Sequence, residues 1–310
     1  MGIEETIKFQ RKKRDAEVLR VNMKNDVPYL TFPQLDACEK IAHLYTTRLG
    51  GVSEGQFRSM NFSIHLGDSP ENVRENYSRI AKILGSELKD ITGTVQTHTT
   101  NIRRVTEEDR GKVAYIPADY GDVDGLVTNV KGIVLAAFTA DCVPIYFVDP
   151  VRECIGLAHS GWRGTVNDMA GNMVRRMQAE FGTDPKDLIV AIGPSICQDC
   201  YEVGDEVAQA ALNAVGEAEE LRELIGKANP GYMYQQGKLR HYLEPGLETG
   251  KYQLDLWLVN MIFLVKAGVL PERIDVTDLC TAENKELLFS HRASHGKRGN
   301  MGAFLKLKEE

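Results

Sequence analysis

The feature that most constrains the fold is a pair of short apolar runs on either side of a turn. Residues 143–148 and 154–158 are apolar and bounded by turn residues, as strands are. The segment 149–152 (DPVR) between them opens with Asp-Pro, which is typical of a type I turn. We therefore expect an antiparallel hairpin in which paired residue numbers sum to 301. In that register Cys142 faces His159 on one side of the ladder, with Cβ atoms roughly 5 Å apart.

The rest of the chain alternates short apolar runs with amphipathic stretches of helical spacing. Ser69 and Pro70 are typical of a helix start, and the apolar positions that follow predict a helix that ends near Gly85. Interleaved helices and hairpins indicate the α/β class with mixed β-sheets. Since no composition break divides residues 26–310, we expect one catalytic domain after a charged leader at 1–25. Further strands are predicted at 125–128, 133–138, 188–192, 274–279 and 287–290, and further helices at 166–181, 202–215 and 254–265.

Charge and cysteine content exclude several classes of protein. A net charge of −7 gives no general attraction to nucleic acid or to an anionic membrane. No uncharged apolar run reaches the roughly 18 residues that span a bilayer, and the start of the chain does not resemble a secretory signal. We therefore expect a cytoplasmic protein whose six cysteines are reduced thiols.

Cys142 and His159 suit either a metal ion or covalent catalysis. His65 lies just before the predicted helix at Ser69, and with the other two it would complete a set of two imidazoles and one thiolate. A catalytic zinc uses three such ligands and keeps a fourth position open, although copper accepts the same ligands. The alternatives are a cysteine nucleophile with a histidine base, or a buried thiol beside a hydrogen-bonded core histidine.

Two glycine-rich loops offer candidate anion sites. Residues 160–165 (SGWRGT) lead from a strand into a helix, so that free N–H groups and Arg163 point toward one place. Arg48 lies in a similar loop at 46–53. A plain tight turn explains the glycines equally well. Cys197 and Cys200 form a lone C-x-x-C pair, which is a weak metal or redox signal, and Cys38, Cys154 and Cys280 are expected to be buried thiols.

Taken together, these motifs resemble the laccase-domain family of bacterial proteins, which are also described as polyphenol-oxidase-like and as purine nucleoside phosphorylases. This resemblance implies a four-layer α/β/β/α sandwich and a zinc ion held by His65, Cys142 and His159. The matching segments are 47–53 (TRLGGVS), Asn61 with 65–68 (HLGD), 95–98 (VQTH), 124–128 (DGLVT), 139–142 (TADC), 158–164 (AHSGWRG), 192–194 (IGP), 200–204 (CYEVG) and 289–292 (FSHR).

The resemblance also implies an activity. The expected reaction is phosphorolysis of adenosine, inosine and methylthioadenosine to ribose 1-phosphates and free base, with adenosine deamination as a second activity. The expected partners are thus purine nucleosides and phosphate. On this hypothesis Arg48, Asn61 and Arg163 bind substrate or phosphate, and His98 and Asp124 transfer protons or hydrogen-bond the substrate beside Cys142 and His159. Asn300 departs from the arginine that relatives often carry there.

Three other functions compete with this hypothesis. A copper-dependent polyphenol oxidase, or laccase, would need clustered histidines, and the chain has no H-x-H pair. A metal-free hydrolase would use Cys142 as nucleophile and His159 as base, for instance to edit peptidoglycan precursors. A purely structural zinc would need a fourth protein ligand, such as Cys197 or Cys200. Metal analysis and product identification separate these functions, while the oligomeric state stays open.

Overall fold

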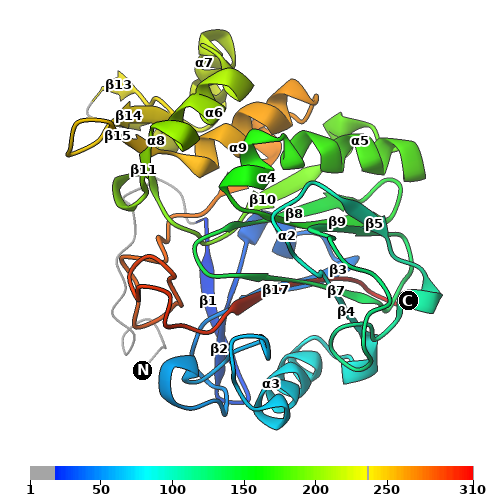
Figure 1. Ribbon diagram of the computed structural model, residues 1–310. Coiled ribbons are helices and arrows are strands. Elements are labelled where there is room, and N and C mark those ends of the chain that lie inside the picture. Colours follow the sequence, from blue (N-terminus) through cyan, green and yellow to red (C-terminus); the bar gives the residue numbers. More distant parts are fainter. Residues whose placement is uncertain (1–17, 236, 310) are drawn as a thin grey trace.

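Two six-stranded mixed sheets form the centre of the molecule (Figure 1). The computed structural model describes residues 18–235 and 237–309. The strand order of the first sheet is β1 (Arg20–Lys24), β2 (Val27–Thr31), β3 (Ile41–Thr46), β17 (Met301–Leu307), β7 (Val134–Thr139), β4 (Ile91–Gly93). The strand order of the second is β16 (Ile274–Val276), β10 (Ile189–Ile192), β8 (Val143–Asp149), β9 (Cys154–Ser160), β6 (Gly125–Thr128), β5 (Ile102–Arg104). In the first sheet only the β4–β7 pair is parallel, and in the second only the β5–β6 and β10–β16 pairs are parallel.

Helices cover the outer face of each sheet (Figure 1). Short strands add a three-stranded sheet, β11 (Glu202–Gly204), β15 (Lys251–Leu254) and β14 (Leu243–Pro245), and a two-stranded one, β12 (Tyr234–Gln235) and β13 (Lys238–Leu239). The α-helices are α2 (Pro33–Asp36), α3 (Pro70–Ile83), α4 (Trp162–Val166), α5 (Met169–Phe181), α6 (Asp205–Val215), α7 (Glu219–Ala228), α8 (Pro230–Met233) and α9 (Leu256–Lys266). The 3-10 helices are η1 (Gly55–Phe57), η2 (Leu88–Asp90), η3 (Glu107–Asp109), η4 (Pro185–Asp187), η5 (Gln198–Cys200) and η6 (Pro271–Arg273). No helix in the described part of the chain is long and apolar enough to cross a membrane.

Side-chain alternation along β8 explains how the layers are held together. Ile145 and Phe147 point into a core shared with α5 and α9, whereas Tyr146 and Val148 point into the core between the two sheets. A third core lies between α3 and the first sheet, where Tyr77 is buried. The sequence prediction of a mixed α/β single domain is confirmed, and the three cores separate a helix layer, two sheets and a second helix layer (Figure 1).

The β8–β9 hairpin forms, but its predicted register is wrong by two residues. Asp149 pairs with Cys154, so the loop has four residues, 150–153, where a two-residue loop was expected. The Asp149 carboxylate accepts hydrogen bonds of 2.9 Å from the N–H groups of the second and third loop residues, which stabilises this longer turn. Because strand side chains alternate with a period of two, a slip of two keeps Cys142 and His159 on the same face.

Other boundaries also differ from the sequence prediction. The single helix expected at 166–181 is divided into α4 and α5, because Asp168 adopts a left-handed conformation (φ 61°) and caps α5 through the Gly171 N–H. Residues 287–290 form no strand, and the first sheet instead receives β17 from the end of the chain. Residues 1–17 of the expected leader lie outside the described residues, while 20–24 form the edge strand β1.

Candidate metal centre

Three side chains that suit a metal ion meet at one end of the β8–β9 hairpin. Cys142 directly precedes β8, His159 lies in β9, and His98 lies in the loop after β4. Each offers one ligand atom, and these atoms lie within 4.8 Å of one another. The Cys142 Sγ is 3.8 Å from Nε2 of His98, and the two imidazole rings cross at 78° with centroids 5.0 Å apart. We call these three residues the His2Cys centre.

A single buried carboxylate shapes the loop that carries His98. Asp124 accepts hydrogen bonds from three successive N–H groups, those of Thr97 (3.0 Å), His98 (3.1 Å) and Thr99 (3.0 Å). The loop thus curls around the carboxylate, and His98 adopts a left-handed conformation with φ 66°. That conformation is uncommon outside glycine, so the hydrogen bonds to Asp124 hold it in place. The result is an imidazole directed at Cys142.

Asp124 also orients His159. Its Oδ1 lies 2.8 Å from Nδ1 of His159, and both side chains are buried. In addition, the backbone N–H of His159 donates to the Asp124 carbonyl at 2.8 Å. With Nδ1 engaged, Nε2 of His159 is the nitrogen that remains to face Cys142. A carboxylate behind a ligating histidine is the usual arrangement in metal sites, because it fixes the ring and raises the basicity of the other nitrogen.

In the metal-free protein, the centre stabilises a thiolate on Cys142 beside an imidazolium on His159. Burial disfavours the ionised thiol of Cys142, but the neighbouring His159 and His98 outweigh it and lower the pKa to about 6. Burial likewise disfavours charged His159, but Cys142 and Asp124 raise its pKa to about 9. Asp124 has a lowered pKa because hydrogen bonds from His159 and the loop outweigh its burial. The thiol is therefore available as an anionic ligand at neutral pH.

Gly161 leaves room for the centre. A Cβ atom added at this position would lie 2.7 Å from Cδ2 of His98 and 3.1 Å from the Cys142 sulfur. Any larger residue would therefore press on two of the three candidate ligands. Gly161, the residue before α4, thus leaves space for the ligands because it has no side chain.

His65 does not belong to this centre. It lies exposed in a turn at residues 64–67, and no group of candidate metal ligands in the described part of the chain includes it. The expected set of His65, Cys142 and His159 is therefore corrected to His98, Cys142 and His159. Sequence proximity to the Ser69 helix favoured His65, whereas Asp124 brings in His98, which the sequence analysis had assigned to proton transfer.

Asn61 is fully buried, and its amide serves the fold. Its Nδ2 donates to the Ser63 carbonyl (3.0 Å) and to Asp68 (2.8 Å), while its Oδ1 accepts from the N–H groups of Ser63 and Asn300. These contacts tie the loop before α3 to the segment that leads into β17. The Asn61 amide thus joins two segments of the chain. The expected contact between Asn61 and substrate stays a prediction.

Arg48 lines a small cationic pocket of about 150 Å³. Its guanidinium donates to the carbonyls of Arg58 (3.0 Å) and Lys285 (2.7 Å) and lies over the Phe289 ring. The pocket also presents Lys285, Lys297 and Arg298, against one carboxylate from Glu286. Pockets for whole drug-sized ligands are typically about 300–1,000 Å³, so this one suits a small anion.

Arg298 lines this pocket, and the sequence analysis missed it. Burial lowers its pKa, while the charges of Cys142 and Asp141 act in the opposite direction. Its guanidinium contacts Asn300 and lies 3.5 Å from Nδ1 of His291, and its Nε is buried with no hydrogen-bond partner in the described structure. A buried donor without a partner is costly, so this atom is suited to receive an acceptor.

The loop at 160–165 differs from the expected anion site. Helix α4 begins at Trp162 and is only five residues long. Arg163 is exposed and lies over the Trp162 ring, and Ser160 is buried in hydrogen bonds with Thr165 and Asn260. Arg163, the residue of this loop that was expected to bind substrate, is therefore open to solvent.

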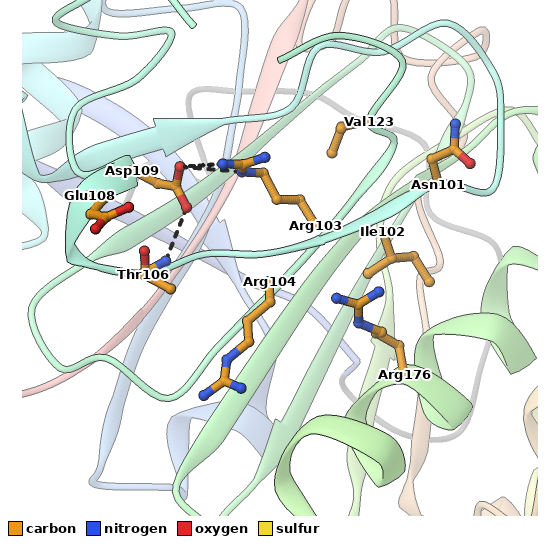
Figure 2. A pocket seen from close by; sticks show the side chains of 9 residues that line it. All are labelled: Asn101, Ile102, Arg103, Arg104, Thr106, Glu108, Asp109, Val123 and Arg176. Atoms are coloured by element: carbon orange, nitrogen blue, oxygen red, sulfur yellow. Dashed lines mark hydrogen bonds and ion pairs between the residues drawn. The ribbon is translucent and has the colours of Figure 1, made fainter. Parts of the chain in front are cut away.

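A larger groove lies beside β5 (Figure 2). It contains three arginines, but each faces a carboxylate: Arg103 pairs with Asp109, and Arg104 and Arg176 both pair with Glu180. None of the three candidate metal ligands lines it. Nε of Arg176 is buried without a hydrogen-bond partner in the described structure, as Nε of Arg298 is. The pocket at Arg48 is the better anion site because it holds four cationic side chains and one carboxylate.

The donor set of the His2Cys centre fits a metal ion. One thiolate and two imidazoles match a catalytic zinc, which uses three protein ligands and keeps one position open. Asp124 supplies the supporting carboxylate that such sites require. Cys197 and Cys200 are not grouped with these ligands among the described residues, so they do not close the fourth position. They lie instead with Cys280, which the sequence analysis had taken for an isolated buried thiol.

Comparison with known proteins agrees with the order of the motifs. A family model described as multi-copper polyphenol oxidoreductase laccase matches residues 42–308. The purine nucleoside phosphorylase YlmD of Bacillus subtilis (strain 168) is 36% identical over 267 residues, which cover 86% of this chain and 88% of the relative. The protein of the same name from Geobacillus stearothermophilus is 39% identical over 269 residues, covering 86% and 89%.

Solved structures show the same fold. The crystal structure of the Bacillus licheniformis hypothetical protein YfiH superposes with a TM-score of 0.79 at 34% identity, covering 93% of this chain and 99% of that one. YlmD from Geobacillus stearothermophilus gives a TM-score of 0.77, also at 34% identity and with the same coverage. The two-sheet architecture and the chain order of its elements are thus shared with proteins of similar length.

Proposed function

The chain belongs to the multi-copper polyphenol oxidoreductase laccase family, and we propose that it is a metal-dependent purine nucleoside phosphorylase. One observation carries the proposal: the His2Cys centre brings two imidazoles and one thiol within 4.8 Å of one another, which is the ligand set of a catalytic metal ion. The names of the relatives support the reaction, and the donor set supports the metal. Zinc is the proposed ion because three ligands of these types leave it one open position.

The proposed metal site consists of His98, Cys142 and His159. Zn²⁺ bound there would supply Lewis-acid polarisation of a substrate atom at the open position. Asp124 holds both imidazoles in place, through its bond to His159 and through the loop that presents His98. Cys142 supplies the anionic ligand, since its pKa is already lowered to about 6.

The proposed phosphate site is the pocket of Arg48, Lys285, Lys297 and Arg298. Arginine binds phosphate with paired, charge-assisted hydrogen bonds, and Nε of Arg298 is a buried donor that such a ligand would satisfy. Arg163, exposed at the start of α4, is proposed as a further contact to the substrate. The excess of positive charge also neutralises the anion as it approaches the sugar.

The reaction then exchanges one bond to the sugar for another. An oxygen of dihydrogen phosphate forms a bond to C1′ of the ribose while the bond from C1′ to the purine nitrogen breaks. The electron pair of that bond leaves with the purine, which takes up the proton that the phosphate gives up. The residues of the pocket orient the nucleophile toward C1′. Adenosine, inosine and methylthioadenosine are the proposed substrates, with adenosine deamination as a second activity.

Asp124 and His159, which are buried, and the half-buried Cys142 also have the arrangement of a catalytic triad, which favours a cysteine hydrolase as a second candidate. Such an enzyme would need no metal and would not use His98. Copper chemistry has less support, because the only candidate metal group with imidazoles among the described residues contains two of them. A multicopper oxidase needs several such ligands for a cluster of redox metals.

Product analysis tests the proposal. Purified protein loaded with Zn²⁺ is incubated with adenosine, with and without phosphate, and the products are identified by mass spectrometry. We expect adenine and ribose 1-phosphate only when phosphate is present, and inosine from the second activity. If neither adenine nor ribose 1-phosphate forms, the phosphorylase proposal is wrong. If full phosphorolysis survives removal of metal by a chelator, the proposed metal dependence is wrong, and if no nucleoside product forms at all, the hydrolase candidate is favoured.

A further inference from the structure

Three cysteines outside the His2Cys centre meet at a second point in the molecule. Cys197 and Cys200 flank η5, and Cys280 follows β16 on a distant segment of the chain. Their sulfur atoms lie within 4.8 Å of one another, and none of the three is in a disulfide within the described part of the chain. Cys197 and Cys280 are only 3% and 0% exposed, and Cys200 is half-buried.

We propose that Cys197, Cys200 and Cys280 form a second metal site, a closed structural centre for a thiophilic ion such as Zn²⁺. Three thiolates bound to tetrahedral zinc at about 2.3 Å would lie about 3.8 Å apart, a spacing that this cluster can adopt. A disulfide would need two cysteines, whereas here three converge. We call these residues the tricysteine centre. The inference stands independently of the proposed function.

The backbone around the sulfurs favours thiolates. The N–H of Cys197 donates to Sγ of Cys280 at 3.3 Å, and a second N–H, that of Glu283, also stabilises the Cys280 thiolate. Such N–H donors stabilise a thiolate ligand, and a metal ion that binds to the cluster releases the protons of the remaining thiols.

Two carboxylates lie beside one of the three cysteines. Asp199 and Glu283 each place an oxygen within 4.8 Å of the Cys197 sulfur and of each other, but neither is grouped with Cys200 and Cys280. A closed site takes four ligands, so one of these carboxylates would have to shift toward the other two sulfurs to supply the fourth. The site is also separate from the two described pockets, since none of the three cysteines lines either of them. These features indicate a structural ion and not a second catalytic one.

The segments that carry the tricysteine centre also hold the backbone next to Cys142. Asp141, the residue before Cys142, has φ 86° and receives hydrogen bonds from both sides of the cluster. Its carbonyl accepts from the N–H of Ile196 at 3.0 Å, and its carboxylate accepts from Thr281 at 2.5 Å. Ile196 precedes Cys197 and Thr281 follows Cys280, so a metal that fixes these two cysteines also fixes the backbone that presents Cys142.

A further residue joins the two centres. Arg292 donates its N–H to the Asp141 carboxylate at 2.7 Å, and its guanidinium donates to the carbonyls of Cys200 (3.4 Å) and Glu202 (3.1 Å). The loop that carries Cys200 is thereby held against Asp141. Loss of the second metal is expected to loosen the His2Cys centre without removing any of its ligands.

Metal counting on the full chain tests the inference. The protein is saturated with Zn²⁺, freed of loose ions by gel filtration, and analysed by mass spectrometry of the elements. We expect two ions per chain in the wild type, one in Cys200→Ser, one in Cys142→Ala and none in the double variant. Cys38→Ser is the matched control, a half-buried cysteine outside both centres, and it should keep two. Cobalt loading of Cys142→Ala should give the sulfur-to-cobalt charge-transfer band of a three-thiolate site.

Two results would overturn the inference. One is a wild type that binds a single ion, which Cys142→Ala abolishes and Cys200→Ser retains. The other is a disulfide between Cys197 and Cys200, mapped in the protein as purified after its free thiols are blocked. If Cys200→Ser does not fold, Cys200→Asp keeps an anionic ligand, and release of zinc from the wild type by a mercurial reagent gives the number of ions directly.

Discussion

The two clusters differ in the features that separate a reactive metal site from a structural one. The His2Cys centre mixes imidazoles with one thiol and lies at the end of a hairpin. The tricysteine centre has three thiols, two of which are buried. A ligand set that leaves a position open can bind substrate, whereas a closed set contributes only to folding. Ligand type and surroundings together therefore indicate which centre performs chemistry.

The groups behind the ligands differ in the same way. A buried carboxylate, Asp124, supports the His2Cys centre and makes His159 more basic. Backbone N–H groups support the tricysteine centre and stabilise the Cys280 thiolate. A carboxylate raises the basicity of a histidine ligand, while N–H donors stabilise a thiolate that stays bound to the metal ion. Each prediction below changes one centre and uses the other as its reference.

The largest effect is expected from replacing a ligand of the His2Cys centre. His98→Ala should lower kcat/KM for phosphorolysis by at least about 10²-fold, the upper range for losing a group that merely orients a ligand. It should also remove one metal ion and leave the ion of the tricysteine centre. His65→Ala is the matched control and should keep both metals and full activity. If His65→Ala behaves like His98→Ala, the assignment of the ligands is wrong.

A smaller loss is expected when the supporting carboxylate is changed. Asp124→Asn should weaken zinc binding at the His2Cys centre by about 10–100-fold, because His159 loses its orienting acceptor. Competition with a chromophoric chelator measures this affinity in the protein as a whole. Asp122→Asn removes only a bond to Thr97 and should have no effect. Equal weakening at both centres would mean that Asp124 acts through general stability alone.

The thiols of the two centres should respond differently to pH in metal-free protein. The pKa of Cys142 is about 6, so its nucleophilic thiolate is lost as pH falls below that value. Its rate of alkylation should rise about tenfold between pH 5 and pH 7, as the ionised fraction does. Cys280 also has a lowered pKa, but it is completely buried and should stay unlabelled. Cys154, with a pKa raised to about 12, is the control.

Peptide mass spectrometry after brief labelling with iodoacetamide gives these rates residue by residue. Alkylation of Cys142 that does not change over this pH range would contradict the thiolate–imidazolium description of the centre. Faster labelling of Cys280 than of Cys142 would contradict the enclosed character of the tricysteine centre.

The smallest effect is expected in the phosphate pocket. Arg298→Ala should raise KM for phosphate about fivefold, which corresponds to about 1 kcal/mol, because three other cations remain in the pocket. Metal content at both centres should not change. Steady-state kinetics at varied phosphate measure the effect, with Lys186→Ala on η4 as a control. An unchanged KM for phosphate would show that phosphate binds elsewhere.

The sequence predicted the parts of the site that depend on local pattern. The hairpin, the face shared by Cys142 and His159, and the helix that starts after Ser69 follow from alternation and capping. The register of the hairpin could not be predicted, since the length of its loop depends on how Asp149 caps the turn. A slip of two residues happened to preserve the shared face.

Residues brought together by distant segments were beyond local pattern. His98 was named as a catalytic residue, but its role as a ligand depends on the loop that Asp124 organises. Local pattern offers no reason to join Cys280 to Cys197 and Cys200. These two lie about 80 positions earlier and meet Cys280 through a bridge between Ser195 and Cys280. The C-x-x-C pair is the sequence signal that could have identified this cluster, since each remaining cysteine is a candidate third ligand to such a pair.

An anomalous difference map from a zinc-loaded crystal, recorded at the zinc absorption edge, tests the account most directly. The account predicts one peak bounded by Nε2 of His98, Sγ of Cys142 and His159, and a second among the three sulfurs of the tricysteine centre. A peak at His65, or no peak between His98, Cys142 and His159, would contradict it.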